Sequence, residues 1–275
     1  MAQTLRIATW NINSLRLRLG LIGKVVEALN PDILCLQETK VPDELFPTDG
    51  VAAFGFDHVL FKGMKGYNGV AILSRVPLQR QDIAPDWCEK GDCRHLAALA
   101  QVPGGAVEIN NFYVPAGGDV PDREANPKFG HKLDFVSEAT QWFAARSGLR
   151  RTVLVGDLNI APMEHDVWSH KQLLDIVSHT PVEIDAMGAL HASLGFIDLT
   201  REAYPEPQKL ASWWSYRAQD FRQSNRGLRL DHILVTPGLR DAAFRSGSAS
   251  SRIHDDVREW ERPSDHAPVT ADLAL

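Results

Sequence analysis

The sequence predicts an α/β fold in which two packed β-sheets lie between outer layers of helices. Apolar runs of strand length recur along the 275 residues, and three longer segments have the spacing of amphipathic helices. Several of the strand-like runs follow one another through turns alone. A regular alternation of strand and helix would predict one parallel sheet, so this mixture favours two sheets with helices outside.

Nine segments have the length and composition of β-strands, and most of them end at polar residues. They are Leu5–Ile12, Ile33–Leu36, His58–Phe61, Val70–Leu73, Leu96–Val102, Val107–Val114, Thr152–Val155, Leu230–Thr236 and Pro268–Leu273. Continuous apolar runs of this kind are typical of strands that are buried on both faces of a sheet.

Three segments are expected to be helical: Leu17–Leu29, which an Asn-Pro pair closes, Lys128–Ala145, and Glu183–Leu194, which a glycine follows. No linker-like or low-complexity stretch divides the chain, and a chain of this length can bury one large core. We therefore expect one domain that spans residues 1–275.

The composition is that of a globular protein. Hydrophobic residues make up 44% and charged residues 23% of the chain, which excludes disordered and collagen-like classes. The first ten residues lack the pattern of a signal peptide, and no stretch approaches the roughly 20 apolar residues that span a bilayer. Three cysteines form no paired framework, which suits a reducing compartment. We expect a monomer in the cytoplasm, without membrane attachment.

The net charge is −6, from 29 basic and 35 acidic residues, and at first this argues against nucleic acid as a partner. An enzyme that holds a divalent cation must gather carboxylates, however, and the local field decides what binds. Basic residues do cluster, for example at Arg222 and Arg226. Any single cluster of this kind can equally be an ordinary surface that is exposed to solvent.

Oxygen-bearing side chains stand where the predicted strands end. A strand that is buried on both faces cannot tolerate carboxylates internally, so they collect where it emerges. If several strands emerge on one side, one cleft receives Asn11, Asn13, Glu38, Asp157, Asn159, Asp231 and Asp265. Any one of these alone is more often a turn former or a helix cap, and His266 alone is more often a surface or core histidine. Six strand ends with the same chemistry favour a shared site.

Such a cleft suits a hard divalent cation. Mg²⁺ prefers oxygen ligands, usually one or two carboxylates together with water and substrate phosphate oxygens. An oxygen-rich set with one prominent histidine favours Mg²⁺, with Mn²⁺ as a substitute, over Zn²⁺. The ion can polarise a phosphoryl oxygen and neutralise the leaving oxygen.

Seven segments carry a family resemblance: TWNINSLRLR, LCLQETK, NFYVPAGG, VGDLNIAP, SWWSYR, NRGLRLDHILVT and ERPSDHAPV. They resemble the exonuclease III family of apurinic/apyrimidinic endonucleases, within the endonuclease/exonuclease/phosphatase superfamily, and they run in family order from Leu5 to Leu275. GDLN and SDHAP recur across the superfamily, including its lipid and inositol phosphatases. QETK, SWWSYR and NRGLRLDHIL are narrower and indicate the DNA-repair branch.

The resemblance implies a four-layer α/β sandwich with two mixed sheets and an active site at one end of them. Glu38 matches the principal metal-ligand carboxylate of the family, and Asn11 lies beside it. Asp265 matches a further acidic position near the metal.

The resemblance also implies roles for the residues that handle the phosphate and the attacking water. Asp157 matches the residue that activates or orients the water, and Asn159 matches one that holds the phosphate. His266 matches the phosphate-contacting histidine, with Asp231 as its carboxylate partner, and Tyr113 matches the phenol that reaches the scissile phosphate.

The aromatic pair Trp213-Trp214 bears on the substrate. Indoles can line a pocket for a base-free sugar or stack on a displaced base, whereas one of two consecutive residues on a strand should face the core. The resemblance favours Trp213 as the pocket wall, with Leu230 near it. The remaining predicted substrate contacts are polar or cationic, and each cation could instead be an ion-pair partner: Asn13, Lys40, Arg217 and Arg229.

Two positions depart from the family pattern. Ser14 stands where the family usually has glycine, and Ala116 stands where the bacterial prototype has a long polar side chain that enters the duplex. The methyl group of Ala116 is too short to insert between stacked bases of the duplex. The sequence therefore leaves open the balance between abasic-site incision and 3′-end trimming. The segment from His165 to Met187 also departs from the prototype and receives no role.

The sequence thus predicts a Mg²⁺-dependent phosphodiesterase that acts on double-stranded DNA with abasic or 3′-end lesions. It would cleave on the 5′ side of abasic sites and remove 3′ blocking groups or 3′-terminal nucleotides. A phosphatase or phosphodiesterase for a small-molecule or lipid phosphate is the main alternative, because it would share GDLN and SDHAP. A non-catalytic DNA-binding module on the same scaffold is less favoured. Such a module should have lost an acidic residue or the histidine of the family motifs, and this sequence retains all of them.

Overall fold

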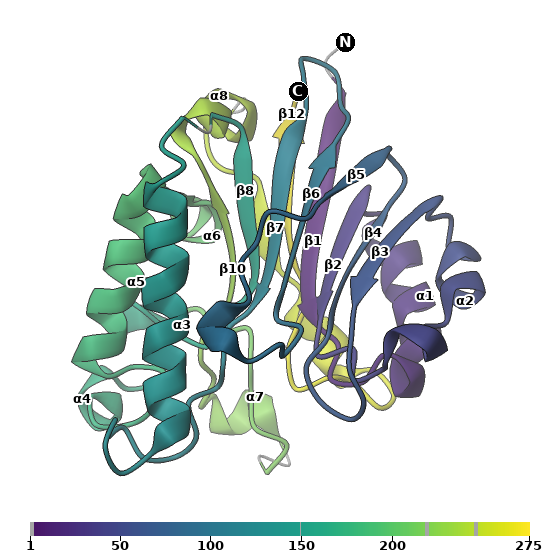
Figure 1. Cartoon of the computed structure of the whole chain (residues 1–275). Helices are drawn as coiled ribbons and strands as arrows, with labels where there is room; N and C mark the ends of the chain where they lie inside the picture. Colours follow the sequence, from purple (N-terminus) through teal and green to yellow (C-terminus); the bar gives the residue numbers. More distant parts are fainter. Residues whose placement is uncertain (1–2, 149, 218–219, 245–246) are drawn as a thin grey trace.

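The computed structural model describes residues 3–148, 150–217, 220–244 and 247–275. Within these ranges the strands form two six-stranded mixed sheets that pack face to face, with helices on their outer faces (Figure 1). The predicted four-layer α/β sandwich is confirmed.

The first sheet is built around the amino-terminal strand. Its order is β11 (Ser251–Ile253), β12 (Val269–Ala274), β1 (Thr4–Asn11), β2 (Ile33–Gln37), β4 (Val70–Ser74) and β3 (His58–Lys62). β1 and β2 are parallel, whereas the other neighbours are antiparallel.

The second sheet has the same plan. Its order is β5 (Leu78–Gln81), β6 (His95–Ala100), β7 (Val107–Tyr113), β8 (Thr152–Asp157), β10 (Asp231–Val235) and β9 (Ile197–Asp198). β7 and β8 are its parallel pair, and the other neighbours are antiparallel.

Helices α1 and α2 cover the first sheet, and α3 and α5 cover the second (Figure 1). The α-helices are α1 (Leu19–Leu29), α2 (Thr48–Ala52), α3 (Pro127–Ala144), α4 (His170–Leu173), α5 (Pro181–Leu194), α6 (Leu199–Ala203), α7 (Phe221–Ser224) and α8 (Arg240–Ala243). Short 3₁₀ turns span Arg16–Arg18, Asp43–Leu45, Trp87–Glu89, Glu164–Asp166, Pro237–Leu239 and Asp255–Glu259.

Local chemistry sets the ends of the two long outer helices. α3 begins with Asn126, whose side chain accepts a hydrogen bond from the Lys128 amide, and a proline occupies the first helical position. α5 begins with a capping box in which Thr180 and Glu183 satisfy each other's backbone amides, and it ends at Gly195 in the left-handed conformation.

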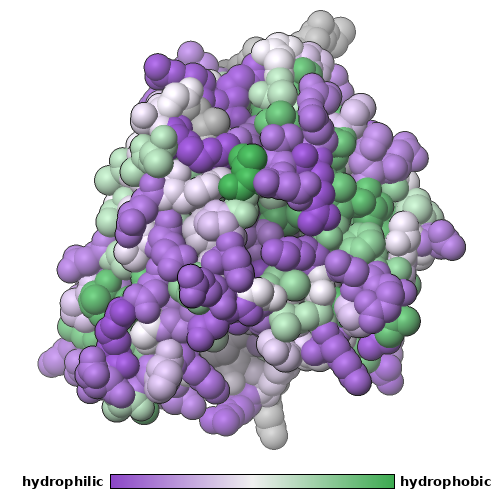
Figure 2. All heavy atoms as spheres, in the orientation of Figure 1, coloured by the Kyte–Doolittle hydropathy of each residue, from purple (hydrophilic) through white to green (hydrophobic). Residues whose placement is uncertain are grey.

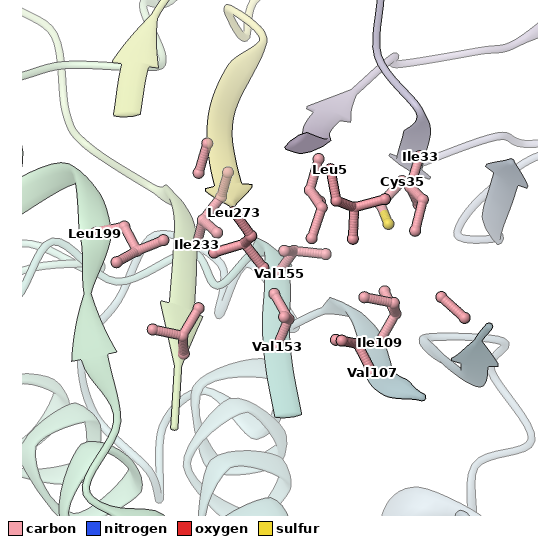
Figure 3. Packing of buried hydrophobic residues seen from close by; sticks show 14 of the residues in the cluster. Leu5, Ile33, Cys35, Val107, Ile109, Val153, Val155, Leu199, Ile233 and Leu273 are labelled. Carbon is pink, nitrogen blue, oxygen red and sulfur yellow. The ribbon is translucent and has the colours of Figure 1, made fainter. Parts of the chain in front are cut away.

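Three apolar layers hold the sandwich together. Between the sheets, one buried cluster joins Ile33 of the first sheet with Ile109 and Val155 of the second (Figure 3). Beneath α1 a second cluster includes Trp10, and beneath α3 a third includes Phe135. Removing apolar surface from water contributes roughly 25 cal/mol per Å², so these layers are the main source of stability.

The structure differs from the sequence-based expectation at the edges of the sheets. The nine predicted strands are present within a few residues, but the edge strands β5, β9 and β11 were not predicted. They are two to four residues long and partly exposed, so they lack a continuous apolar run. The predicted first helix begins as the 3₁₀ turn Arg16–Arg18 before α1.

The strand directions bring the predicted polar residues to one end of the sandwich, opposite both termini (Figure 1). β1, β2, β7 and β8 all end there, and the antiparallel strands β10 and β12 begin there. In the register of the sheets, Tyr113 and Asp231 both lie beside Asp157.

Hydrophilic residues cover most of the face of the molecule shown in Figure 2, and apolar residues are interspersed among them. Within the described ranges, none of the helices combines the length and the apolar character needed to cross a bilayer.

Candidate active site

One pocket opens at the end of the sandwich where these strands meet. Its cavity volume is about 430 Å³, within the range of about 300–1,000 Å³ that is typical of ligand pockets. The polar residues of its lining include Glu38, Asp157, Asn159, Asp265 and His266. These residues are far apart in the chain, and the two sheets bring them together.

Glu38 follows β2 and has three hydrogen-bond donors around its carboxylate. Tyr113 Oη donates to Oε1 at 2.6 Å, Asn11 Nδ2 donates to Oε1 at 3.1 Å, and Lys40 Nζ lies 2.7 Å from Oε2. Burial by itself raises the pKa of Glu38, but the bonds from Lys40 and Tyr113 outweigh it and hold the pKa below its ordinary value. Glu38 is therefore an ionised, partly buried carboxylate.

The carboxylate of Asp265, like that of Glu38, accepts hydrogen bonds from neighbouring side chains. Asn13 Nδ2 donates to Asp265 Oδ1 at 2.9 Å, while its own Oδ1 accepts from Lys40 Nζ at 2.6 Å. Trp213 Nε1 donates to Asp265 Oδ2 at 3.0 Å. Burial raises the pKa of Asp265, but the charge of His266 and these donors outweigh burial and hold the pKa below its ordinary value.

Asp157, at the end of β8, has a different environment. It is almost fully buried, and its Oδ2 accepts from Asn11 Nδ2 at 2.8 Å and from Asn159 Nδ2 at 3.1 Å. The backbone amide of Asn159 donates to Oδ1 at 3.0 Å. Burial raises the pKa of Asp157 to about 7, with the nearby Asp231 adding to the rise and His266 opposing it.

His266 forms a dyad with Asp231. Its Nδ1 lies 2.8 Å from Asp231 Oδ2, which also accepts from Ser212 Oγ at 2.6 Å. Its Nε2 lies 3.7 Å from Asp157 Oδ2. Burial lowers the pKa of His266, but the carboxylates of Asp231 and Asp157 outweigh burial and raise it to about 10. The imidazole is thus a cation at neutral pH, and Nε2–H faces Asp157.

The wall of the pocket is apolar and includes Trp213, Leu228 and Leu230. Trp214, the second member of the tryptophan pair, is buried in the interior, as alternation along an extended segment predicts. The backbone of Trp213 bridges to Leu228 on one side and to His266 on the other. The apolar wall is therefore fixed directly beside the dyad.

The segment that received no role from the sequence supplies the rest of the wall. Trp168, Leu173, Ile176 and Val177 also line the pocket. At the rim, the exposed Arg226 guanidinium lies 4.9 Å from the centre of the Trp168 ring.

The sequence model of the endonuclease/exonuclease/phosphatase family matches residues 8–266. The chain belongs to this family. Exodeoxyribonuclease III from Haemophilus influenzae is 32% identical over 277 residues, which cover 98% of this chain and all of that relative. The protein is therefore an enzyme of the exodeoxyribonuclease III and AP endonuclease type.

Two solved structures are similar over nearly the whole enzyme. A 3′ phosphatase from Neisseria, bound to a product DNA hairpin, is 34% identical with a TM-score of 0.88. An AP endonuclease from Archaeoglobus fulgidus is 31% identical with a TM-score of 0.86. Each comparison covers 98% of this chain and 100% of the other.

The donor set of the enzyme fits a hard cation. Glu38 and Asp265 offer ionised carboxylates, and Lys40 Nζ already lies against Glu38 Oε2 and Asn13 Oδ1, so these oxygens stabilise one positive charge. Asp157, Asp231 and His266 form a tighter cluster, with ligand atoms within 4.8 Å of one another. In that cluster His266 Nδ1 lies 2.8 Å from Asp231 Oδ2, which also accepts from Ser212 Oγ, so these ligand atoms are already engaged with one another.

Two predicted phosphate contacts, Arg217 and Arg229, are not among the residues that line the pocket. Arg229 is fully buried, and its guanidinium is paired with Asp166 and Asp198, so the prediction that it faces a phosphate is wrong. The sequence could not reveal these partners, which are distant in the chain. Arg217 is exposed on the turn that follows Trp214.

Other residues of the site were missed by the sequence-based reasoning. Ser212 donates to Asp231, and Ser264 Oγ donates to the backbone oxygen of Asn11 at 2.6 Å. Both serines lie directly beside predicted site residues, in SWWSYR and SDHAP, which is the signal that could have found them. Leu228, two residues before Leu230 on an extended segment, shares its face, so alternation could have found it.

Proposed function

We propose that the enzyme is a Mg²⁺-dependent DNA-repair phosphodiesterase that acts at abasic sites and at blocked or recessed 3′ ends of double-stranded DNA. One observation carries the proposal. The carboxylate of Asp157, the imidazolium of His266 and the indole of Trp213 line a single pocket, so one phosphate and one adjoining sugar can be bound together.

The cation belongs on the side of Glu38. Mg²⁺, with Mn²⁺ as a substitute, would be held by Glu38 with Asp265 and Asn11 nearby, and it would polarise the phosphoryl group and offset the charge of the leaving oxygen. The lowered pKa values of the two carboxylates support this assignment, since both remain ionised and ready to bind a cation at neutral pH.

Asp157 is the proposed acceptor of the proton from the attacking water. Its raised pKa of about 7 lies near the operating pH, where a general base is most effective. The amides of Asn11 and Asn159 fix the orientation of its carboxylate. In-line attack forms a bond from the water oxygen to phosphorus and breaks the bond to the leaving oxygen, without a covalent enzyme intermediate.

His266 and Tyr113 are the proposed phosphate contacts. Asp231 holds His266 Nδ1, which leaves Nε2–H as a charge-assisted donor to a phosphate oxygen. Tyr113 stays protonated, because burial and the charges of Glu38 and Asp157 raise its pKa well above the ordinary value. Its single O–H bonds Glu38 Oε1 at 2.6 Å, and it can donate to a phosphate oxygen by turning from that carboxylate.

The apolar wall indicates the kind of substrate. Trp213 and Leu230 offer a surface for a base-free sugar or an unstacked base, and base stacking on an aromatic ring is worth about 1–3 kcal/mol. The exposed Arg226 at the rim is placed to contact the DNA backbone. The DNA hairpin bound to the Neisseria phosphatase and the activity named for the Archaeoglobus endonuclease support DNA as the substrate. We further propose that the enzyme acts as a monomer in the cytoplasm. The three cysteines of this chain are free, which fits a reducing compartment.

One set of assays tests the proposal. Purified enzyme with Mg²⁺ is given duplexes that carry an abasic-site analogue, a 3′-phosphate or a recessed 3′ end, and size-exclusion chromatography reports the oligomeric state. We expect cleavage of at least one duplex, its loss with EDTA, and restoration by Mg²⁺ or Mn²⁺. Trp213→Ala should raise KM for the DNA substrates. Hydrolysis of inositol phosphates without cleavage of any of these DNAs would overturn the proposal in favour of a small-molecule phosphatase.

A further inference from the structure

A buried ion pair lies between the two outer helices of the second sheet, apart from the carboxylates of the site. Lys132 of α3 and Glu183 of α5 are both fully buried, and Lys132 Nζ lies 2.5 Å from Glu183 Oε1. Taking both charges out of water is expensive, and two apolar side chains of similar volume would often stabilise a protein equally well. The pair therefore calls for an explanation beyond packing.

The remaining contacts of the ammonium go to three separate loops. Lys132 Nζ donates to the backbone oxygen of Asn159 at 2.7 Å, to that of Ala116 at 3.3 Å and to Ser178 Oγ at 3.4 Å. Asn159 follows β8, Ala116 follows β7, and Ser178 precedes α5. All three residues line the active-site pocket. The ammonium of Lys132 thus links three loops that each contribute a residue to the lining of the pocket.

Glu183 fixes the third loop in addition. Its two carboxylate oxygens accept from the Ser178 amide at 3.0 and 2.9 Å, and Oε2 also accepts from the Thr180 amide at 3.1 Å and from Thr180 Oγ1 at 2.7 Å. This loop carries Ile176 and Val177, which form part of the apolar wall. The position of that wall therefore depends on the carboxylate of Glu183.

The packing around the pair leaves no spare room. Gly117 has a φ of +89°, and a Cβ added there would lie 2.9 Å from Lys132 Cδ and 3.0 Å from Val177 Cγ1. The loop after β7 can approach the stem of Lys132 and the pocket wall this closely only because residue 117 is a glycine.

The contacts also reach the reacting group. Lys132 holds the backbone oxygen of Asn159, and the amide and side chain of the same Asn159 hold both oxygens of Asp157. Lys132 bonds Asn159 and not Asp157 itself, and its charge acts on Asp157 across space, so it is a positioning residue.

We propose that the Lys132–Glu183 pair sets the distance between Asp157 and the apolar wall of the pocket, and that this is its role in the enzyme. The inference rests on the proposed function for its catalytic consequence, but the positioning of the three loops does not depend on it.

The test removes both charges together, since removing one would leave the other buried without compensation. Lys132→Met with Glu183→Gln keeps similar volumes. The new side-chain amide at position 183 still offers one oxygen to the loop amides, but the ammonium is gone. A matched control is Arg146→Met with Glu108→Gln, which removes a pair between the turn after α3 and β7, with Arg146 Nη2 and Glu108 Oε2 2.8 Å apart. Neither control residue lines the pocket.

Two readouts separate positioning from general stability. Amide hydrogen exchange should become faster in the segments 114–118, 157–161 and 176–180 of the first double variant, and remain slow in the central strands. With a 3′-phosphate duplex, kcat should fall about 10²-fold while KM changes less than about threefold, because a displacement near 1 Å can cost that much rate. The control variant should keep wild-type exchange in these segments and wild-type kcat.

Wild-type exchange in the three segments, or faster exchange spread evenly over both sheets, would overturn the proposal. So would a kcat equal to that of the control. If the wild-type enzyme cleaves none of the DNA substrates, the proposed function fails, and the exchange comparison still decides whether the pair positions the loops.

Discussion

The two sheets contribute the same residue types to the site but place them in different environments. From the first sheet come Glu38 and Asp265, whose pKa values lie below the ordinary range because Lys40, amide donors and His266 outweigh burial. From the second comes Asp157, whose pKa rises to about 7 because burial dominates and Asp231 lies nearby.

The difference shows how carboxylates acquire separate tasks. A carboxylate that stays ionised is suited to hold a cation, whereas one that titrates near neutral pH is suited to accept a proton. The donors that cause the difference are specific: the cation Lys40 faces Glu38, whereas the amides of Asn11 and Asn159 face Asp157. Substitutions on each side should therefore have different signatures.

The largest effect is expected for Asp157→Asn, on the side of the second sheet. We expect kcat to fall about 10²–10⁴-fold, because an amide cannot accept the proton of the water. DNA affinity, measured by fluorescence anisotropy, should change little, and Mg²⁺ affinity should be retained. Turnover at the wild-type rate would remove Asp157 from the role of base.

The next effect is expected for Glu38→Gln, on the side of the first sheet. Isothermal titration with Mg²⁺ should show binding that is weaker by about tenfold or more, or about 1.4 kcal/mol, since an ionised ligand is lost. Activity should recover in part at high Mg²⁺, which Asp157→Asn should not do. Unchanged Mg²⁺ binding by this variant would instead favour the cluster of Asp157, Asp231 and His266 as the cation site.

The smallest effect concerns Ser14, which follows β1 and has a φ of +90°. A non-glycine residue in this region costs about 1–3 kcal/mol, and a glycine costs about 0.5–1 kcal/mol in chain entropy. Ser14→Gly should therefore raise the free energy of unfolding by about 1 kcal/mol in a urea titration. Ser14→Ala keeps the Cβ and should change it by less than about 0.5 kcal/mol. Equal values for the two variants would show that the backbone here is not strained.

Much of the fold and the polar part of the site could be predicted because their signals are local. Buried strands are continuous apolar runs, and carboxylates gather where such strands emerge, as Asp157 does after β8. Tertiary partners leave no such local signal. Arg229 and Arg217 look alike in the sequence, yet the first is buried between Asp166 and Asp198 and the second is exposed.

The buried position of Lys132 could be predicted from the sequence, but its partner could not. In α3 it is spaced by three and four residues from the buried Phe129 and Val136, so a charge stands on the apolar stripe of the helix. That position indicates a buried partner, but it does not identify Glu183, which is 51 residues away in the sequence. The wall formed by Trp168 and Ile176 has no comparable pattern, and it became visible only in three dimensions.

The pairing of β12 with β1 has a consequence for biosynthesis. Thr4 lies opposite Ala274 in the first sheet, so β1 can complete its pairing only after a strand about 260 residues later in the chain has been made. His266 and Asp265 arrive with that late strand, and Trp10 Nε1 bonds the backbone oxygen of His266 at 2.9 Å. A nascent chain therefore lacks two residues of the proposed active site until this late segment has been made, and a ribosome-bound fragment that stops before Asp265 should not show the proposed cleavage of DNA.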